Sequence, residues 1–315
     1  MRRGSRSTPE GEHVPVMLPE VLADLGPRGG DIAVDCTVGR AGHSVELLSR
    51  IGPTGKLIGF DLDPNNLRPA RERLAAVASN FTLHHDNFAA LAATLAAEST
   101  QADVVLADLG MSSMQVDDPN RGFSFMRDGP LDMRMDPTRG RTAAELLATL
   151  SAADLAGAFR DLGDEPQAEA IAAAIVASRK TAVPQRTREL AALIREAAPV
   201  MILHGPGQPK PRQQAIRPTA RVFQALRILV NRELANLEAL LRALPHCLKP
   251  GGRIAIISFH SGEDRLVKQA FRDGLRAGLY SAAADEPIRA SEKERWGNPR
   301  SRSAKLRWAR RAGPV

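Results

Sequence analysis

Short apolar runs alternate with helical patterns along the first third of the chain. Runs rich in Val, Ile and Leu predict buried strands at residues 32–36, 56–61, 81–85 and 104–107. Between these runs, apolar residues recur at helical spacing near residues 44–50, 64–78 and 88–97. Strands and helices that alternate in this way predict an α/β fold with a parallel sheet and helices on both faces.

The alternation stops after the fourth strand. Residues 117–141 are rich in Gly, Pro, Asp, Met and Arg without a clear period, which predicts a long functional loop. Three Ala-rich amphipathic helices are then expected at residues 143–160, 166–179 and 187–198. A linker rich in Pro and Gly follows at residues 204–218.

The sheet pattern resumes in the last third of the chain. We expect a long helix at residues 219–243, a strand at 253–260, a helix at 262–273 and a final edge strand at 303–309. The predicted domains are a disordered basic tail at residues 1–12, a discontinuous sheet domain at 13–132 and 218–315, and an inserted all-helical domain at 133–217.

Composition narrows the class of protein. With 315 residues, 43% of them hydrophobic, the chain can bury a sizeable core. Cys36 and Cys247 lack C-x-x-C spacing, so neither a disulfide framework nor a zinc site is indicated, and we assign no metal ligands. We find neither a membrane-spanning run nor a secretion signal, and therefore expect a cytoplasmic protein without a membrane partner.

Positive charge is segregated along the chain, whose formal net charge is +7. Residues 197–232 hold six basic side chains and no acidic one, and residues 295–315 hold seven basic side chains and no acidic one. Such segregation indicates a polyanionic partner such as nucleic acid. The alternative is a solvated basic face or tail. Arg221 and Arg227, on the predicted long helix, are candidates for internal pairing with Glu233, Asp108 or other acidic residues at the edge of the core instead.

The turn after the first predicted strand is a candidate ligand loop. Asp35 ends the strand, and Gly39 and Gly42 follow before a helix begins. A turn of this kind lets a nucleotide-like ligand lie against bare backbone at a helix N-terminus. The strict dinucleotide fingerprint G-x-G-x-x-G is not satisfied, which argues against a nicotinamide-dependent oxidoreductase.

Acidic residues end the second and fourth predicted strands. Asp61 ends the second strand, where a carboxylate is placed to accept hydrogen bonds from both hydroxyl groups of a ribose. Its alternative role is a helix cap, although Asp63, directly before Pro64, suits that role better. Asp108 ends the fourth strand and is expected at the same edge of the sheet.

This set of features resembles the class I S-adenosylmethionine-dependent methyltransferases, a Rossmann-like fold. Within that class the chain is similar to the small-subunit (16S) ribosomal RNA cytosine-N4 methyltransferase family. The motifs that carry the resemblance are H-V-P-V-M-L-P-E at 13–20, G-R-A-G-H-S at 39–44, D-L-G-M-S-S-M-Q at 108–115, R-G-F-S-F-M-R-D-G-P-L-D-M-R-M-D at 121–136, R-V-F-Q-A-L-R-I-L-V-N at 221–231, I-S-F-H-S-G-E-D-R at 257–265 and N-P-R-S-R-S-A-K-L-R at 298–307.

The resemblance implies S-adenosyl-L-methionine as cofactor and methylation of the N4 amine of one cytosine in the decoding region of the small ribosomal subunit. It places the inserted helical domain in substrate recognition. The residues that it implies for cofactor binding are Ala41, Gly42 and His43 in the first loop, Asp61 for the ribose, Phe88 beside the adenine, and Asp108 with Gln115 around the methionine end.

Two positions depart from the family pattern. The family usually has Gly where this chain has Ala41, which we expect to be acceptable only with a negative φ. It has Leu where this chain has Gly262, which is expected to loosen the start of the following helix.

The expected chemistry requires alignment more than a strong base. The cytosine amine is a weak nucleophile, so hydrogen-bond acceptors must hold its N–H groups while the lone pair faces the methyl carbon. Asp108, Asp132, Asp136 and the carbonyl groups of Leu109 and Gly110 are candidate acceptors, and Asp132 and His260 are our candidate catalytic side chains.

Other interpretations remain open at this point. A pure RNA-binding assembly factor that keeps the cofactor fold is the alternative function, and intact Asp61, Asp108 and Gln115 argue against it. We interpret Trp296 and Trp308 as packing residues, with base stacking as the alternative. The sequence does not decide between a monomer and a homodimer.

Overall fold

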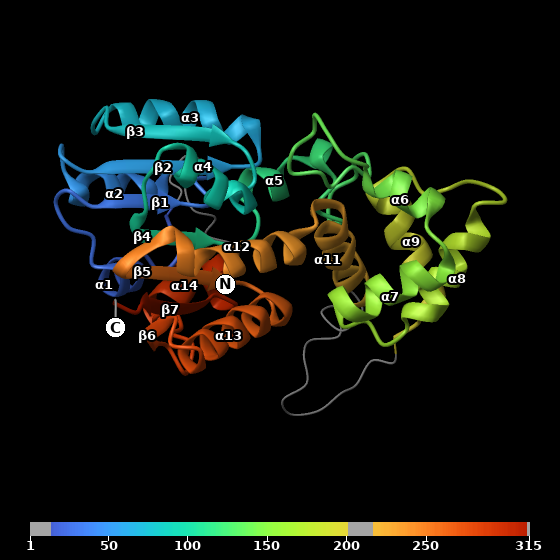
Figure 1. The fold of residues 1–315 in the computed structure, drawn as a ribbon. Helices are drawn as coiled ribbons and strands as arrows, with labels where there is room; N and C mark the ends of the chain where they lie inside the picture. The colour runs from blue at the N-terminus through green and yellow to red at the C-terminus, as the bar shows by residue number, and fades with distance from the viewer. Residues whose placement is uncertain (1–13, 201–216, 314–315) are drawn as a thin grey trace. The chain divides into compact units, whose positions relative to one another are not determined.

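The structure, a computed structural model, describes residues 14–200 and 217–313 (Figure 1). The chain divides into two compact units, one formed by Met1–Gly110 with Leu234–Val315 and the other by Met111–Glu233. The predicted tail at residues 1–12 lies outside the described residues. So does most of the predicted linker at 204–218, whose last two residues begin a helix.

A sheet of seven strands forms the centre of the first unit, in the order β3-β2-β1-β4-β5-β7-β6. The first five strands in this order are mutually parallel, whereas β7 is antiparallel to both β5 and β6. The strands are β1 Ile32–Asp35, β2 Lys56–Asp61, β3 Phe81–His85, β4 Ala102–Asp108, β5 Leu248–Ser258, β6 Tyr280–Ala283 and β7 Lys305–Arg311. The expected α/β sheet is thus confirmed, with an antiparallel pair added at one side.

The expectation that the last strand lies at the sheet edge is wrong. β7 lies between β5 and β6, and the short strand β6, which the sequence pattern did not predict, is the edge strand. β7 has the burial of an inner strand because Leu306 and Ala309 are fully buried. Four residues of β6 give too short an alternation to identify from sequence.

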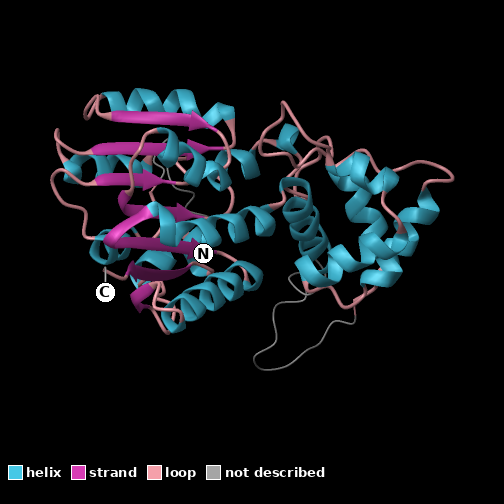
Figure 2. Ribbon diagram, viewed as in Figure 1, coloured by secondary structure: helices cyan, strands magenta, loops and turns pink. Residues whose placement is uncertain are grey.

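Helices cover both faces of this sheet, as expected (Figure 2). One hydrophobic core joins apolar side chains of α1 Leu18–Leu25, α2 Gly42–Ile51 and α3 Pro64–Ala75 to one face. The other core joins those of α4 Leu91–Ala97, α12 Glu233–Cys247 and α13 Ser261–Arg276 to the opposite face. The remaining elements of this unit are η1 Phe88–Ala90, α14 Glu292–Gly297 and η3 Pro299–Arg302.

The second unit is helical around its own core. Leu155, Phe159, Ile171, Ile194 and Leu226 are fully buried there. Its elements are α5 Ser113–Asp117, η2 Pro119–Arg121, α6 Ala143–Thr149, α7 Ala152–Gly163, α8 Ala168–Ser178, α9 Thr187–Ala197 and α11 Arg217–Asn231.

Two helices that the sequence pattern predicted as continuous are each broken. The stretch 143–160 divides into α6 and α7 because Ser151 caps a new helix, its side chain accepting from the amide of Asp154 at 3.1 Å. The stretch 219–243 divides at Arg232, whose φ of 51° ends α11 before α12 begins. A left-handed residue cannot continue a right-handed helix.

The unit boundaries fall between Gly110 and Met111 and between Glu233 and Leu234. The sequence pattern places them instead between residues 132 and 133 and between 217 and 218. The difference arises because α11 contributes Val222 and Leu226 to the helical core, while α12 contributes Leu240 to the sheet core. Within the described ranges, no helix is long and apolar enough to span a lipid bilayer.

Candidate functional site

The first strand ends on Asp35, whose buried carboxylate organises the turn that follows. One carboxylate oxygen accepts from Ser44 Oγ at 2.5 Å and the other accepts from the amide of Thr37 at 3.0 Å. Burial raises the pKa of Asp35, and the hydrogen bond from Ser44 opposes that rise. The turn is also tied to the second strand, because the amide of Val38 donates to the carbonyl of Phe60 at 3.0 Å. The sequence pattern indicated no partner for Asp35.

Ala41, at the end of this turn, has a left-handed backbone. Its φ is 61°, so the expectation of a negative φ at this position is wrong. The turn imposes that conformation, since the amide of Ala41 donates to the carbonyl of Val38 at 2.7 Å just before α2 begins. Ala41 is the N-cap residue of α2 and its side chain cannot accept a hydrogen bond. The first amide groups of α2 therefore have no capping side chain.

Asp61 joins the first turn to the second strand. Its Oδ2 accepts from the amide of Gly39 at 2.6 Å, and its Oδ1 accepts from the amide of Asp63 and the side chain of Asn66 at 2.8 and 3.1 Å. Burial raises the pKa of Asp61 to about 6, against the lowering effect of these hydrogen bonds. Asp63 caps α3 as predicted, accepting from the amide of Asn65 at 3.1 Å. A ribose role for Asp61 stays a prediction.

Asp108 lies at the end of β4, beside the first turn. Its amide donates to Thr37 Oγ1 at 2.7 Å, and its Oδ2 is 3.7 Å from Nδ1 of His43. Its Oδ1 is buried without a hydrogen-bond partner. Burial raises the pKa of Asp108 to about 6, while the positive fields of His43 and Arg300 oppose that rise. The structure therefore brings together the first loop, Asp61 and Asp108, as the sequence pattern predicts.

The two other cofactor residues that the family resemblance implies lie on short elements. Phe88 opens the turn η1, packs partly buried against the sheet core, and follows Asn87, which accepts from the amide of Ala89 at 2.9 Å. Gln115 belongs to the second unit and is buried at the start of α5, where its Oε1 accepts from the amide of Ser112 at 3.0 Å. Their contacts with a cofactor stay predictions.

Asp132, in the second unit, forms a two-point ion pair with Arg134. The Nε and Nη2 atoms of Arg134 each donate to a different oxygen of this carboxylate at 2.8 Å. Burial raises the pKa of Asp132, but the hydrogen bonds from Arg134 outweigh burial and lower it overall. A carboxylate held in this way is a weak proton acceptor. The related candidate Asp136 accepts from Thr138 Oγ1 at 2.6 Å and pairs with Arg139.

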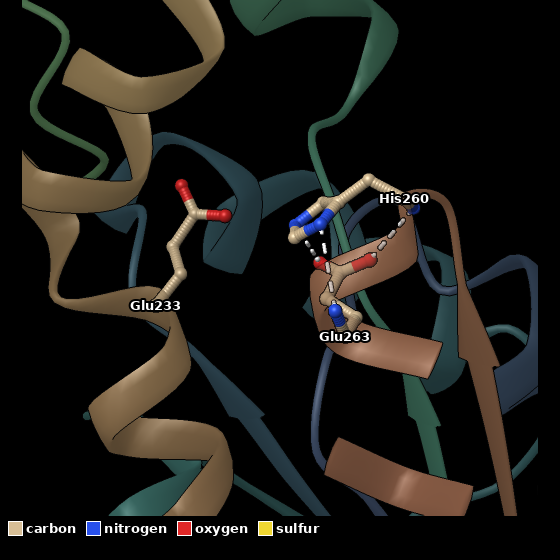
Figure 3. A group of neighbouring side chains, drawn as sticks. All are labelled: Glu233, His260 and Glu263. Atoms are coloured by element: carbon tan, nitrogen blue, oxygen red, sulfur yellow. Dashed lines mark hydrogen bonds and ion pairs between the residues drawn. The ribbon is translucent and has the colours of Figure 1, made fainter. Parts of the chain in front are cut away.

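His260 caps α13 together with Glu263. Nδ1 of His260 accepts from the amide of Glu263 at 3.4 Å, and Oε2 of Glu263 accepts from the amides of Phe259 and His260 at 2.8 and 3.2 Å. Figure 3 shows the imidazole and this carboxylate side by side at the start of α13. Glu233, drawn in the same figure, accepts two hydrogen bonds from Arg227 at 2.8 Å. His260 thus has a structural role in the helix start, and a catalytic role stays a prediction.

The residues of the first unit fit S-adenosylmethionine. A buried acceptor without a partner, Asp108 Oδ1, suits a cationic or N–H-bearing group, and the uncapped start of α2 suits an anionic one. An α-amino acid end offers both. Gly42 keeps the backbone bare, because a Cβ there would come within 3.2 Å of Pro15.

Comparison with known proteins agrees with this arrangement. The model of the MraW methylase family matches residues 10–312. The Ribosomal RNA small subunit methyltransferase H of Chromobacterium violaceum is 46% identical over 97% of this chain and 97% of its own length. The protein of the same name from Acidobacterium capsulatum is 41% identical over 94% of this chain and 97% of its own length. The chain therefore belongs to the MraW methylase family.

Proposed function

We propose that this protein transfers a methyl group from S-adenosyl-L-methionine to the exocyclic N4 amine of a cytosine in the decoding region of small-subunit (16S) ribosomal RNA. The name of the relatives supports the ribosomal substrate and the transfer of a methyl group. One structural observation carries the proposal further, namely the buried acceptor of Asp108 at the edge of the sheet where Asp61 and the uncapped helix α2 also lie.

In the first unit, binding of the cofactor falls to the first loop, Asp61, Phe88 and Asp108. When bound, S-adenosylmethionine supplies an electrophilic methyl group on a sulfonium centre. Asp61 already accepts two backbone amides, so its carboxylate is fixed before a ribose reaches it. Its accessible fraction is only 8%, which limits competition by water.

The protein's contribution to the transfer is to orient the amine. The nitrogen lone pair of cytosine N4 is delocalised into the ring, so acceptors that hold its N–H groups must turn the lone pair toward the methyl carbon. A carboxylate offers about four lone pairs, so Asp108, whose Oδ1 has no protein partner, is able to accept from the cofactor and from this amine. The carbonyl groups of Leu109 and Gly110 are next along the chain. Asp132 is less suited, because Arg134 occupies both of its oxygens.

The proton leaves after the new bond has formed. Methylated cytosine N4 is strongly acidic while it carries an extra positive charge, so a weak base suffices. With a pKa of about 6, the carboxylate of Asp108 is mostly ionised at neutral pH and is able to take that proton. A cytosine that is paired and stacked in an RNA duplex cannot reach such a site. The RNA must therefore present the target cytosine unpaired or flipped out of the duplex.

Because the substrate is ribosomal and the relatives are bacterial, we assign the reaction to the cytoplasm. The alternative function is an RNA-binding assembly factor that has kept the cofactor fold. The buried acceptor of Asp108 favours the enzyme, because an unused unpartnered carboxylate oxygen is a cost to folding.

Incubation with radiolabelled cofactor tests the proposal. Purified protein is given methyl-labelled S-adenosylmethionine together with small-subunit ribosomal RNA or assembled subunits, and the nucleosides are separated by mass. Label in N4-methylcytidine at one decoding-region position is expected. RNA binding without transfer to any nucleoside contradicts the enzyme and supports the assembly factor.

A further inference from the structure

Trp296, in α14, is a large aromatic side chain on the surface. Its side chain is 78% exposed, so the interpretation of Trp296 as a packing residue is wrong. Trp308, by contrast, is half-buried on the inner strand β7, in keeping with packing. A single exposed apolar residue is ordinary on a protein surface. Trp296 is of interest because α14 is bonded to a segment that contacts the first loop.

Hydrogen bonds tie α14 and the residue after it to the segment of residues 14–17. Oε1 of Glu294 accepts from the amide of Met17 at 2.8 Å, and Nδ2 of Asn298 donates to the carbonyl of Val14 at 3.4 Å. Val14 is itself 53% exposed. Two exposed apolar side chains, Val14 and Trp296, therefore stand on segments that are bonded to each other.

The same segment contacts the first loop on its other side. The carbonyl of Val16 accepts from Nε2 of His43 at 2.9 Å, and Pro15 lies against Gly42. Residues 14–17 are thus a strap between α14 and the loop that we assign to the cofactor. Trp296 stands one segment away from that loop, within the first unit of the structure.

Positive charge surrounds Trp296 in the sequence and reaches the site in space. Arg295 precedes it, Arg300 and Arg302 follow in η3, and Arg302 is held by donating from Nε to the carbonyl of Arg295 at 3.1 Å. Burial raises the pKa of Asp108, and the charge of Arg300 opposes that rise, so Arg300 lies within electrostatic range of this carboxylate. Of the acidic residues on α14, Glu294 is bound to Met17, and Glu292 is a distant 4.0 Å partner of Arg295.

We propose that Trp296 stacks on an unpaired base of the substrate RNA beside the target cytosine, while Arg295 and Arg302 contact the flanking phosphates. Aromatic side chains next to guanidinium groups are the usual means of holding single-stranded RNA, since every base offers a π-face and every linkage a charge. The charge favours RNA over a second copy of this basic chain. The inference rests on the proposed function and locates its substrate on the surface.

Trp296→Ala is the test variant, and Trp296→Phe and Leu275→Ala are its controls. Leu275 is also exposed, at 38%, and lies on α13. The probe is a single-stranded oligoribonucleotide of decoding-region sequence, whose binding to the full-length protein is measured by fluorescence anisotropy from low to moderate salt. Circular dichroism and cofactor calorimetry check that each variant is folded.

Loss of one base stack predicts that Trp296→Ala binds the oligoribonucleotide about 5- to 150-fold more weakly. Trp296→Phe is expected to keep most of the affinity, and Leu275→Ala all of it. The salt dependence of Trp296→Ala should equal that of the parent, because stacking involves no counterion release.

Two RNA-binding results overturn the inference: an affinity of Trp296→Ala within twofold of that of the parent, or an equal decrease in the affinity of Leu275→Ala. A sedimentation coefficient of RNA-free Trp296→Ala that differs from that of the RNA-free parent also overturns it, because it identifies a second copy of the chain as the occupant. Methyl transfer separates this outcome from failure of the proposed function. If the parent methylates RNA and Trp296→Ala binds and methylates RNA equally well, the stacking role of Trp296 is contradicted and the proposed function is not. A parent that binds RNA through Trp296 without transferring methyl groups contradicts the enzyme alone.

Discussion

His43 turns Nδ1 toward the carboxylate of Asp108, with 3.7 Å between Nδ1 and Oδ2. Its other ring nitrogen, Nε2, is 2.9 Å from the carbonyl oxygen of Val16, which only accepts, so Nε2 must carry a hydrogen. The hydrogen bond to Val16 therefore fixes the ring in the orientation that points Nδ1 at Asp108.

Asp108→Asn is expected to stabilise the folded protein at neutral pH. Burial raises the pKa of Asp108 from 3.8 to about 6, so between these values the folded state holds more protons than the unfolded state. The free energy of unfolding then falls as pH rises through this window and stays low above it. Removing the charge should raise the free energy of unfolding at pH 7 by about 1–3 kcal/mol.

Urea denaturation of the parent and Asp108→Asn at pH 4 and pH 7 measures this effect. The gain should be large at pH 7 and nearly absent at pH 4, where the parent carboxyl group is already neutral. The same variant should bind S-adenosylmethionine more weakly. A variant destabilised equally at both pH values contradicts a strained, ionised Asp108.

Asp61→Ala should weaken binding of S-adenosylmethionine by about 1.5–3 kcal/mol, through loss of charge-assisted hydrogen bonds to the ribose. The matched control is Asp63→Ala, two residues away and also buried, which removes the cap of α3. That control should lower the free energy of unfolding by about 1 kcal/mol and leave cofactor affinity nearly unchanged. Calorimetry on both folded variants decides, and equal affinities for Asp61→Ala and the parent contradict the ribose role.

Ala41→Gly should stabilise the protein, because Ala41 has a φ of 61°. A left-handed backbone costs a residue with a Cβ about 1–2 kcal/mol, whereas glycine adopts it freely. After the larger entropy of glycine in the unfolded chain is subtracted, a net gain of about 0.5–1 kcal/mol remains. Ala172→Gly, at a buried position inside α8, is the control and should lose about 1 kcal/mol. Thermal or urea unfolding that shows both variants destabilised alike contradicts the strain at Ala41.

The strand ends were predictable from sequence because buried parallel strands are nearly continuous apolar runs that stop at polar residues. Asp35, Asp61 and Asp108 each end such a run, and the sheet places the three ends at one edge. The hydrogen-bond partners around them were not predictable in the same way. The Ser44 hydroxyl donates to Asp35, and the Thr37 hydroxyl oxygen accepts from the amide of Asp108. Both pairs are defined only by the folded turn.

Backbone conformation accounts for most of the remaining differences. Arg232 and Ala41 have positive φ without being Gly or Asn, so no residue preference indicates the break between α11 and α12 or the form of the first turn. The interpretation of Trp296 was wrong because composition alone favours burial of tryptophan. Internal pairing of Arg221 and Arg227 was expected with Glu233, Asp108 or other acids, and the structure pairs Arg227 with Glu233 at 2.8 Å and Arg221 with Glu165 at 3.7 Å.

Four of the seven basic side chains at residues 295–315 form two pairs with different surroundings. Lys305 and Arg307 both pair with Asp264, at 2.8 and 2.7 Å, and Arg307 is only 2% exposed. These two charges hold β7 against α13 and are not free for phosphate. Arg295 and Arg302 lie at the surface next to Trp296, so they are the ones expected to contact RNA.

Arg295→Ala combined with Arg302→Ala should weaken RNA binding and reduce the slope of log affinity against log salt by about 1–2, because each phosphate that the variant no longer neutralises keeps its counterion. The matched control removes two exposed arginines of α3, Arg68 and Arg71, which changes net charge equally. Binding of decoding-region RNA to both double variants is measured at several salt concentrations. A slope lowered equally in the control means that only net charge matters, and an unchanged slope in the test variant means that RNA is bound elsewhere on the protein.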